Sequence, residues 1–335
     1  HTRAGARRGR RHVGGRRRVQ GCPGRRPGRS VRVAGTTAAP AWVGLEPTWQ
    51  LHAIGTRGRI DPVQDLPVDA RAAVRRVIDD FDSSWSRFRS DSLVTLLARG
   101  SGPVPLPADG AAMLDAFAEL SLATSGAVNP LVGASLERLG YDAEYSLSGG
   151  EPLAAPADWT ARVRWSDGRI ALDSPALIDV GALGKGRLVD IAARTLAPWT
   201  GGHAVVDASG DLLVSGATQR IGLEHPFDPS RAIGVWEVQD AALCASAANR
   251  RAWGDGLHHV LDARTGVPVR AVAATWVVAD TAMRADALAT ALFFDGGDAL
   301  AHRWGAEWVR MLTNGRVEWS RGCSADLFAA AANVA

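Results

Sequence analysis

The sequence predicts an α+β fold, in which antiparallel sheets are flanked by helices. The chain has 335 residues, 46% of them apolar, which is enough to bury a sizeable core. Helical patterns lie mainly in its first half and short strand patterns mainly in its second. Helices and strands do not alternate as the βαβ units of a doubly wound parallel sheet require, so an α+β arrangement is favoured.

The first half begins with a strand pattern and continues with helices. Apolar and β-branched residues over Trp49–Ile60 predict a first strand. Apolar side chains then recur at three- and four-residue spacing over Val68–Trp85 and Asp109–Thr124, which is typical of amphipathic helices. A third helix is expected over Gly186–Leu196, directly after a glycine-rich turn.

Short apolar runs bounded by turn residues predict the remaining strands. A hairpin is expected at Ser166–Gly168 and another at Asn314–Gly315. One further helix is expected over Ala285–Phe294. The predicted strands are Arg162–Trp165, Arg169–Leu172, Ala204–Val206, Leu212–Val214, Arg220–Leu223, Ile233–Val238, His259–Leu261, Ala274–Val278, Val309–Leu312 and Arg316–Trp319.

Positive charge is concentrated at the start of the chain. Residues 1–40 hold 12 Arg and no acidic residue, so a chain of net charge +3 leaves 26 basic against 35 acidic residues in its body, a net charge of −9. An Arg/Gly tail can bind nucleic acid or an anionic membrane. Because it lacks apolar periodicity, we expect instead a disordered tail or a mis-assigned start, followed by one domain over 41–335 and no nucleic-acid partner.

Targeting and cysteine signals are weak. The three cysteines are too few and too scattered for a disulfide framework or a zinc knuckle. No apolar stretch is long enough for a spanning helix. No secretory signal precedes Ala41, and the lipobox-like Val19–Cys22 directly follows three arginines. Localisation therefore stays unknown: cytoplasmic by default, or extracytoplasmic if the true N-terminus differs.

Lys185 is the only lysine among 38 basic residues. Such a bias indicates a genome that uses Arg wherever either cation serves, so Lys185 marks either a site that needs a compact ammonium or a leftover surface residue. It lies in Asp179–Gly186, where three glycines open a helix and let N–H groups approach an anion. The spacing fits neither a Walker A loop nor a dinucleotide fingerprint, and an ordinary turn is the alternative.

Two further pairs carry possible chemistry. His258 and His259 lie side by side on a predicted strand and should point to opposite faces, so one is available as a general base, unless both are structural. Asp286 and Thr290 are one helical turn apart and share a face. Their oxygens suit a hard cation such as Mg²⁺. The alternative is a solvated Asp with Thr bonded to its own helix.

Seven segments in this order resemble those of the ApbE family of FAD:protein FMN transferases. The resemblance runs from about His52 to Thr313 and implies a compact mixed fold related to T-folds. The segments are Ile54–Thr56 (IGT), Ser86–Ser92 (SRFRSDS), Gly126–Gly133 (GAVNPLVG), Asp179–Gly186 (DVGALGKG), Asp207–Asp211 (DASGD), His258–Gly266 (HHVLDARTG) and Asp286–Thr290 (DALAT).

The resemblance implies a transferase that splits FAD at its pyrophosphate with Mg²⁺. FMN would pass to a Thr or Ser hydroxyl of an acceptor flavoprotein with an FMN-binding domain, releasing AMP. Asp286, Thr290 and the main-chain carbonyl of Ala182 would hold the metal. His259, in preference to His258, would be the base, and Lys185 would contact phosphate. The nucleotide-binding residues implied are Ile54, Phe88, Ala127, Val128, Asn129, Asp179, Lys185 and Leu261.

The chain also departs from the family pattern. Ile54 replaces Met, Asn129 replaces Asp, and Phe88 stands where many members have Tyr. Ala289 occupies a position that is a second carboxylate in some relatives, and Ala247 lies at a glycine position. Two alternatives follow: an FAD pyrophosphatase that forms FMN and AMP, and a flavin-binding protein without turnover.

Overall fold

A computed structural model describes residues 48–53, 56–62, 65–254 and 256–328. The predictions made for residues 1–40 and for Ile54 lie outside them. The centre of the fold is an eight-stranded sheet whose neighbouring strands all run antiparallel. In spatial order its strands are β1 (Trp49–Ala53), β2 (Thr56–Pro62), β6 (Ala204–Asp207), β7 (Asp211–Ser215), β10 (Ala241–Ala247), β15 (Val272–Ala279), β16 (Glu307–Leu312) and β17 (Val317–Trp319).

A small sheet covers one face of the central sheet. It consists of β8 (Gln219–Glu224), β9 (Ala232–Val238) and β18 (Asp326–Leu327). Its side chains Leu223 and Trp236 share an apolar cluster with Val214 of the central sheet. The remaining strands form a three-stranded sheet and two short hairpins. They are β3 (Val104–Pro105), β4 (Val163–Ser166), β5 (Arg169–Leu172), β11 (Ala252–Trp253), β12 (Leu257–His258), β13 (Leu261–Asp262) and β14 (Val267–Pro268).

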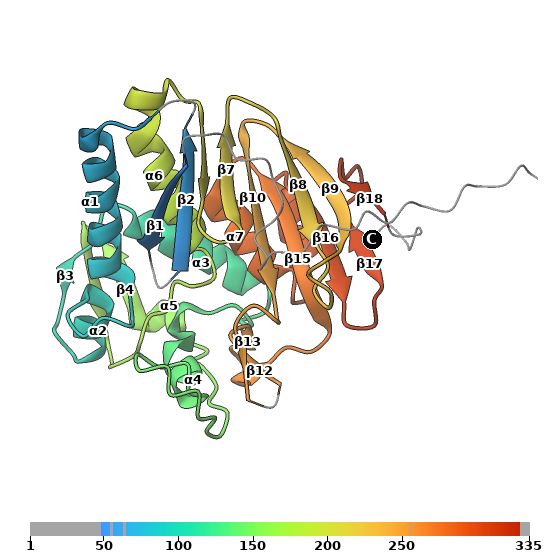
Figure 1. Ribbon diagram of the computed structural model, residues 1–335. Coiled ribbons are helices and arrows are strands. Elements are labelled where there is room, and N and C mark those ends of the chain that lie inside the picture. Colours follow the sequence, from blue (N-terminus) through green and yellow to red (C-terminus); the bar gives the residue numbers. More distant parts are fainter. Residues whose placement is uncertain (1–47, 54–55, 63–64, 255, 329–335) are drawn as a thin grey trace, which may run out of the picture.

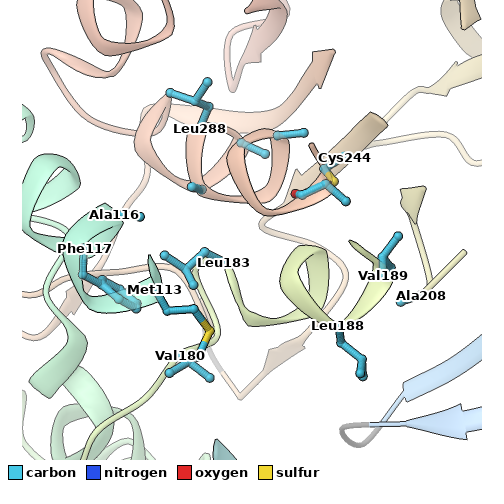
Figure 2. Close-up of a cluster of buried hydrophobic side chains, with 14 of the residues drawn as sticks. Met113, Ala116, Phe117, Val180, Leu183, Leu188, Val189, Ala208, Cys244 and Leu288 are labelled. Carbon is cyan, nitrogen blue, oxygen red and sulfur yellow. The ribbon is translucent and has the colours of Figure 1, made fainter. Parts of the chain in front are cut away.

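Helices cover the other face (Figure 1). There α6 and α7 pack on the sheet, and α1 and α3 pack outside them. In Figure 2, Phe117 and Met113 from α3 lie near Leu183, beside the start of α6, in the main core, which also includes Leu288 of α7. The helices are α1 (Val68–Trp85), α2 (Leu93–Ala98), α3 (Gly110–Ala123), η1 (Pro130–Val132, 3₁₀), α4 (Gly133–Arg138), α5 (Trp159–Arg162), α6 (Gly184–Thr200), α7 (Ala282–Ala291) and α8 (Gly297–Arg303). Within the described residues, no helix combines the length and apolarity that a membrane span needs.

The α+β prediction is confirmed, but two strand predictions are wrong. The run Trp49–Ile60 is not one strand: Trp49 pairs with Ile60 across an antiparallel hairpin. The expected strand over His259–Leu261 is also interrupted. There the Val260 N–H donates to His258 Nδ1 at 3.3 Å, and such a local side-chain bond competes with strand pairing.

The helix predictions hold with shifted ends. The first helix has the predicted bounds, and Asp109 and Thr124 flank the second. The third helix begins two residues earlier than predicted, at Gly184. The last begins at Ala282 because the Thr281 hydroxyl accepts a hydrogen bond from the Arg284 N–H at 3.4 Å and caps the helix.

Gly186 sets how closely α6 approaches α7. A Cβ at this position would overlap the carbonyl oxygen of Ala282 and come within 2.8 Å of Asp286 Cβ. We therefore expect Gly186→Ala to lower the free energy of unfolding by about 1–3 kcal/mol, the usual cost of overpacking. Urea unfolding measures this change. Gly222→Ala is the control, because the nearest atom to its new Cβ lies at 3.9 Å; equal stability of both variants would contradict the prediction.

Candidate active site

A cavity with a water-accessible volume of about 140 Å³ opens beside the N-terminus of α6. Its walls come from the end of α1, from η1 and α4, from the turn before α6, from the β12–β13 segment and from α7. Two predicted site residues, His258 and Asp286, are not part of the wall. The predicted residues that line it are Phe88, Ala127, Val128, Asn129, Asp179, Ala182, Lys185, His259, Leu261 and Thr290.

Lys185 lies between two buried carboxylates and is not a surface remnant. Its Nζ forms a close ion pair with Asp211 and donates to Asp286 Oδ1 at 3.1 Å. The other oxygen of Asp286 accepts the Gly186 N–H at 3.0 Å. Burial lowers the pKa of Lys185, but the two carboxylates outweigh burial and raise it above its usual value. Burial and the charge of Asp211 raise the pKa of Asp286 against the effect of Lys185.

Removing this ammonium should destabilise the fold. Lys185→Met leaves Asp211 and Asp286 buried without their cation, and we expect the free energy of unfolding at pH 7 to fall by about 3 kcal/mol. The loss should shrink towards pH 5.5, because a folded carboxyl with a raised pKa takes up a proton as pH falls. Urea unfolding at both pH values tests this. No loss at either pH would show that the carboxylates do not depend on Lys185, and an equal loss at both would show that their charge is not its cause.

Asp211 is the main residue of this cluster that the sequence prediction missed. It closes the segment Asp207–Asp211, one of the seven that resemble the family, but the resemblance implies no role for it. Strand pairing places Asp211 opposite Cys244, and burial raises the pKa of that thiol well above its usual value. The sequence feature that could have identified Asp211 is its position as the second acidic residue, after Asp207, at the end of a tight turn.

The predicted metal ligands come together in part. Thr290 Oγ1 donates to the carbonyl oxygen of Ala182 at 3.3 Å, so these two oxygens are neighbours. Asp286 lies one turn earlier on α7. No group of three or more His, Cys, Asp or Glu suited to a metal occurs in the part of the chain that the structure describes. A set of one carboxylate, one hydroxyl and one carbonyl nevertheless has the oxygen chemistry that Mg²⁺ prefers.

The two histidines differ in environment. His258 is buried, and its ring bonds to the chain on both sides: Nε2 to the Val269 carbonyl at 2.7 Å, and Nδ1 to the Val260 N–H. His259 lines the cavity, and its buried Nδ1 has no hydrogen-bond partner among the described residues. Burial and the charge of Arg251 lower the pKa of His259 to about 3. The ring is therefore neutral at ordinary pH.

Asp179 and Asn129 each stabilise a local bend in the cavity wall. Asp179 accepts hydrogen bonds from Arg87 Nε at 2.6 Å and from the Gly181 N–H at 2.7 Å. Asn129 caps η1 by accepting the Leu131 N–H at 2.9 Å, and it donates to the Pro156 carbonyl. Both polar side chains are thus occupied by the chain itself.

Two arginines in the cavity wall were not predicted. Arg251 donates to the Tyr141 hydroxyl at 3.0 Å, and Arg87 lies at the end of α1 beside Phe88. The sequence alone could not identify them, because no pattern distinguishes these two arginines from the other 35. Only the fold shows that they face the same cavity as Lys185.

Comparison with known proteins decides the family. The model of the ApbE family matches residues 48–309. The chain belongs to the ApbE family. An FAD:protein FMN transferase from Haemophilus influenzae is 25% identical over 252 residues, covering 67% of this chain and 72% of that protein. Another from Treponema pallidum is 26% identical over 278 residues, covering 72% and 77%. The family prediction is confirmed.

Solved ApbE structures share the fold. The ApbE protein from Thermotoga maritima has a TM-score of 0.70 at 23% identity, with 83% of this chain and 96% of that chain covered. The flavin transferase ApbE from Vibrio cholerae has a TM-score of 0.67 at 19% identity, with 85% and 98% covered. At these identities the likeness concerns the fold, and it agrees with the α+β architecture described above.

Proposed function

We propose that this protein transfers FMN from FAD to a Thr or Ser hydroxyl of an acceptor flavoprotein and releases AMP, with Mg²⁺ as its metal. Relatives named FAD:protein FMN transferases support the reaction class. The observation that carries the proposal is that one cavity is lined by the neutral His259, by Lys185 with its two buried carboxylate partners behind it, and by the oxygens of Thr290 and Ala182.

Three groups of residues divide the chemistry. Asp286, Thr290 and the Ala182 carbonyl would hold Mg²⁺, which when bound neutralises charge on the pyrophosphate. Lys185 holds Asp286 in place beside the N-terminus of α6, the positive end of the helix dipole, which favours a phosphate. His259 takes the proton of the incoming hydroxyl at Nδ1. The hydroxyl oxygen then bonds to the FMN phosphorus as the bond to the AMP oxygen breaks.

The low pKa of His259 fits this role once the nucleotide is present. Burial depresses the pKa in the free protein, and the charges of Arg251 and Lys185 depress it further. A bound anion offsets these charges and raises the pKa towards the value at which a base is most effective. Free protein thus keeps the imidazole unprotonated, and bound substrate makes it more basic.

Product analysis tests the proposal. The full chain is incubated with FAD, Mg²⁺ and a purified FMN-binding domain that carries a target Thr, with the Thr→Ala domain as the matched control. Flavin that stays on the acceptor through denaturation, together with an equal amount of AMP, is the expected result. Free FMN and AMP in both reactions would instead show an FAD pyrophosphatase. Unchanged FAD would show a flavin-binding protein without turnover.

A further inference from the structure

Arg87 carries hydrogen-bond donors that nothing in the described chain satisfies. The residue is only 4% exposed and lines the cavity. Its Nε is paired with Asp179, but Nη1 and Nη2 are buried without a hydrogen-bond partner among the described residues. Buried donors of a charged group are costly to leave unpaired and are normally satisfied. The wall therefore holds two donors available to a ligand.

The guanidinium is also held in place. Its carbon lies 4.2 Å from the ring centre of Phe88 and 4.9 Å from that of Tyr141. Tyr145 stacks on Phe88 with ring centres 5.4 Å apart and planes 5° apart. These aromatic contacts and the Asp179 ion pair keep the side chain from turning to solvent. This part of the cavity wall is aromatic and suits a planar ring.

We propose that Arg87 binds two adjacent acceptor atoms on the edge of the isoalloxazine ring of the flavin substrate. This assignment rests on the proposed function and adds the residue that hydrogen-bonds to the flavin ring. The guanidinium offers donors only, in a planar fork. Isoalloxazine has matching edges: N5 beside the C4 carbonyl, and N1 beside the C2 carbonyl. On the adenine ring, N1 and N7 each lie beside the N6 amino group, which is itself a donor.

The charge balance around Arg87 also favours the flavin ring over a phosphate as its ligand. Asp179 already balances Arg87, so this guanidinium has no surplus positive charge of its own to offer an anion. Neutral carbonyl and ring-nitrogen acceptors need hydrogen bonds and no counter-charge. The start of α6, the positive end of the helix dipole next to Lys185, is the better place for the pyrophosphate.

Separate ligand titrations test the assignment. Riboflavin and AMP are each titrated into the wild-type protein and into Arg87→Met and Arg87→Lys. Arg87→Lys keeps a cation beside Asp179 but removes the two Nη donors. A loss of affinity in this variant is therefore not caused by breaking the ion pair with Asp179. Arg162→Gln is the control, because it breaks an exposed Arg–Asp pair outside the cavity. Thermal midpoints confirm that each variant is folded.

Both Arg87 variants should bind riboflavin about 10- to 100-fold more weakly, as expected for lost hydrogen bonds to a charged group, with AMP binding unchanged. Three results would overturn the assignment: unchanged riboflavin affinity, an equal loss for both ligands, or no riboflavin binding by the wild-type protein. The transfer assay is run alongside. If the Arg87 effect appears but no FMN is transferred, the proposed function fails alone; if FMN is transferred and riboflavin affinity is unchanged, this assignment fails alone.

Discussion

Asp286→Asn should lower the initial rate of FMN transfer on the order of 10³-fold at submillimolar Mg²⁺, which corresponds to the several kcal/mol that a metal ion supplies to phosphoryl chemistry. The substitution keeps the shape of the side chain but removes the anionic oxygen that a hard cation prefers. Because the defect is one of metal affinity, the rate should recover in part as Mg²⁺ is raised. Initial rates over a Mg²⁺ titration measure both effects.

A stability measurement separates this metal effect from damage to the fold. Asp286 is fully buried and contacts Lys185 and the Gly186 N–H, so the variant is compared with wild type by urea unfolding at equal Mg²⁺. Thr290→Ser keeps the hydroxyl and should retain most activity, whereas Thr290→Val should not. A rate for Asp286→Asn that does not respond to Mg²⁺ would contradict its assignment as a metal ligand.

His259→Asn should lower turnover by about 10²–10⁴-fold, the usual contribution of a positioned general base. Additional Mg²⁺ should not restore it, in contrast to Asp286→Asn. Residual activity should rise with pH, as more of the acceptor hydroxyl ionises unaided. Single-turnover rates from pH 6 to 9 check this. His258→Asn is the matched control, because His258 bonds to the Val269 carbonyl and does not line the cavity. A stably folded His258 variant with the larger loss would reverse the assignment.

The same His259 substitution has a stability signature. The folded pKa of about 3 lies below the usual value near 6.5. Between these values the unfolded chain binds a proton that the folded chain does not, so this residue costs stability as pH falls below 6.5. His259→Asn removes that cost. The free energy of unfolding of the variant minus that of wild type should therefore be about 1–2 kcal/mol larger at pH 5 than at pH 8. Urea unfolding at both pH values measures it.

Periodicity was sufficient for the long elements of this fold and insufficient for the short ones. The first helix matched its predicted bounds because a full apolar stripe specifies it. The break between His258 and Leu261 escaped prediction because a single side-chain bond causes it. Strand β10 (Ala241–Ala247) was missed because its alanine-rich sequence lacks a β pattern, and burial between β7 and β15 decides its conformation.

Motif order singled out residues that share one cavity, and the fold showed which of their atoms are in contact. Lys185 was singled out by composition, yet its two carboxylate partners follow only from the packing of α6 against β7 and α7. The two cavity arginines, Arg87 and Arg251, could not be chosen from a chain with 37 arginines. What distinguishes these two arginines from the others is their place in the cavity wall, which the sequence does not show.

In the proposed function, binding of metal and nucleotide requires the ammonium–carboxylate cluster and therefore a completely folded chain. Its members come from α6, β7 and α7, and Lys185 and Asp286 are 101 positions apart. Closing so long a loop must precede the ion pair, so a nascent or proteolytically shortened chain that ends before α7 has no cluster to assemble. Such a fragment should neither hold a divalent cation nor compete with the finished protein for flavin nucleotides during synthesis.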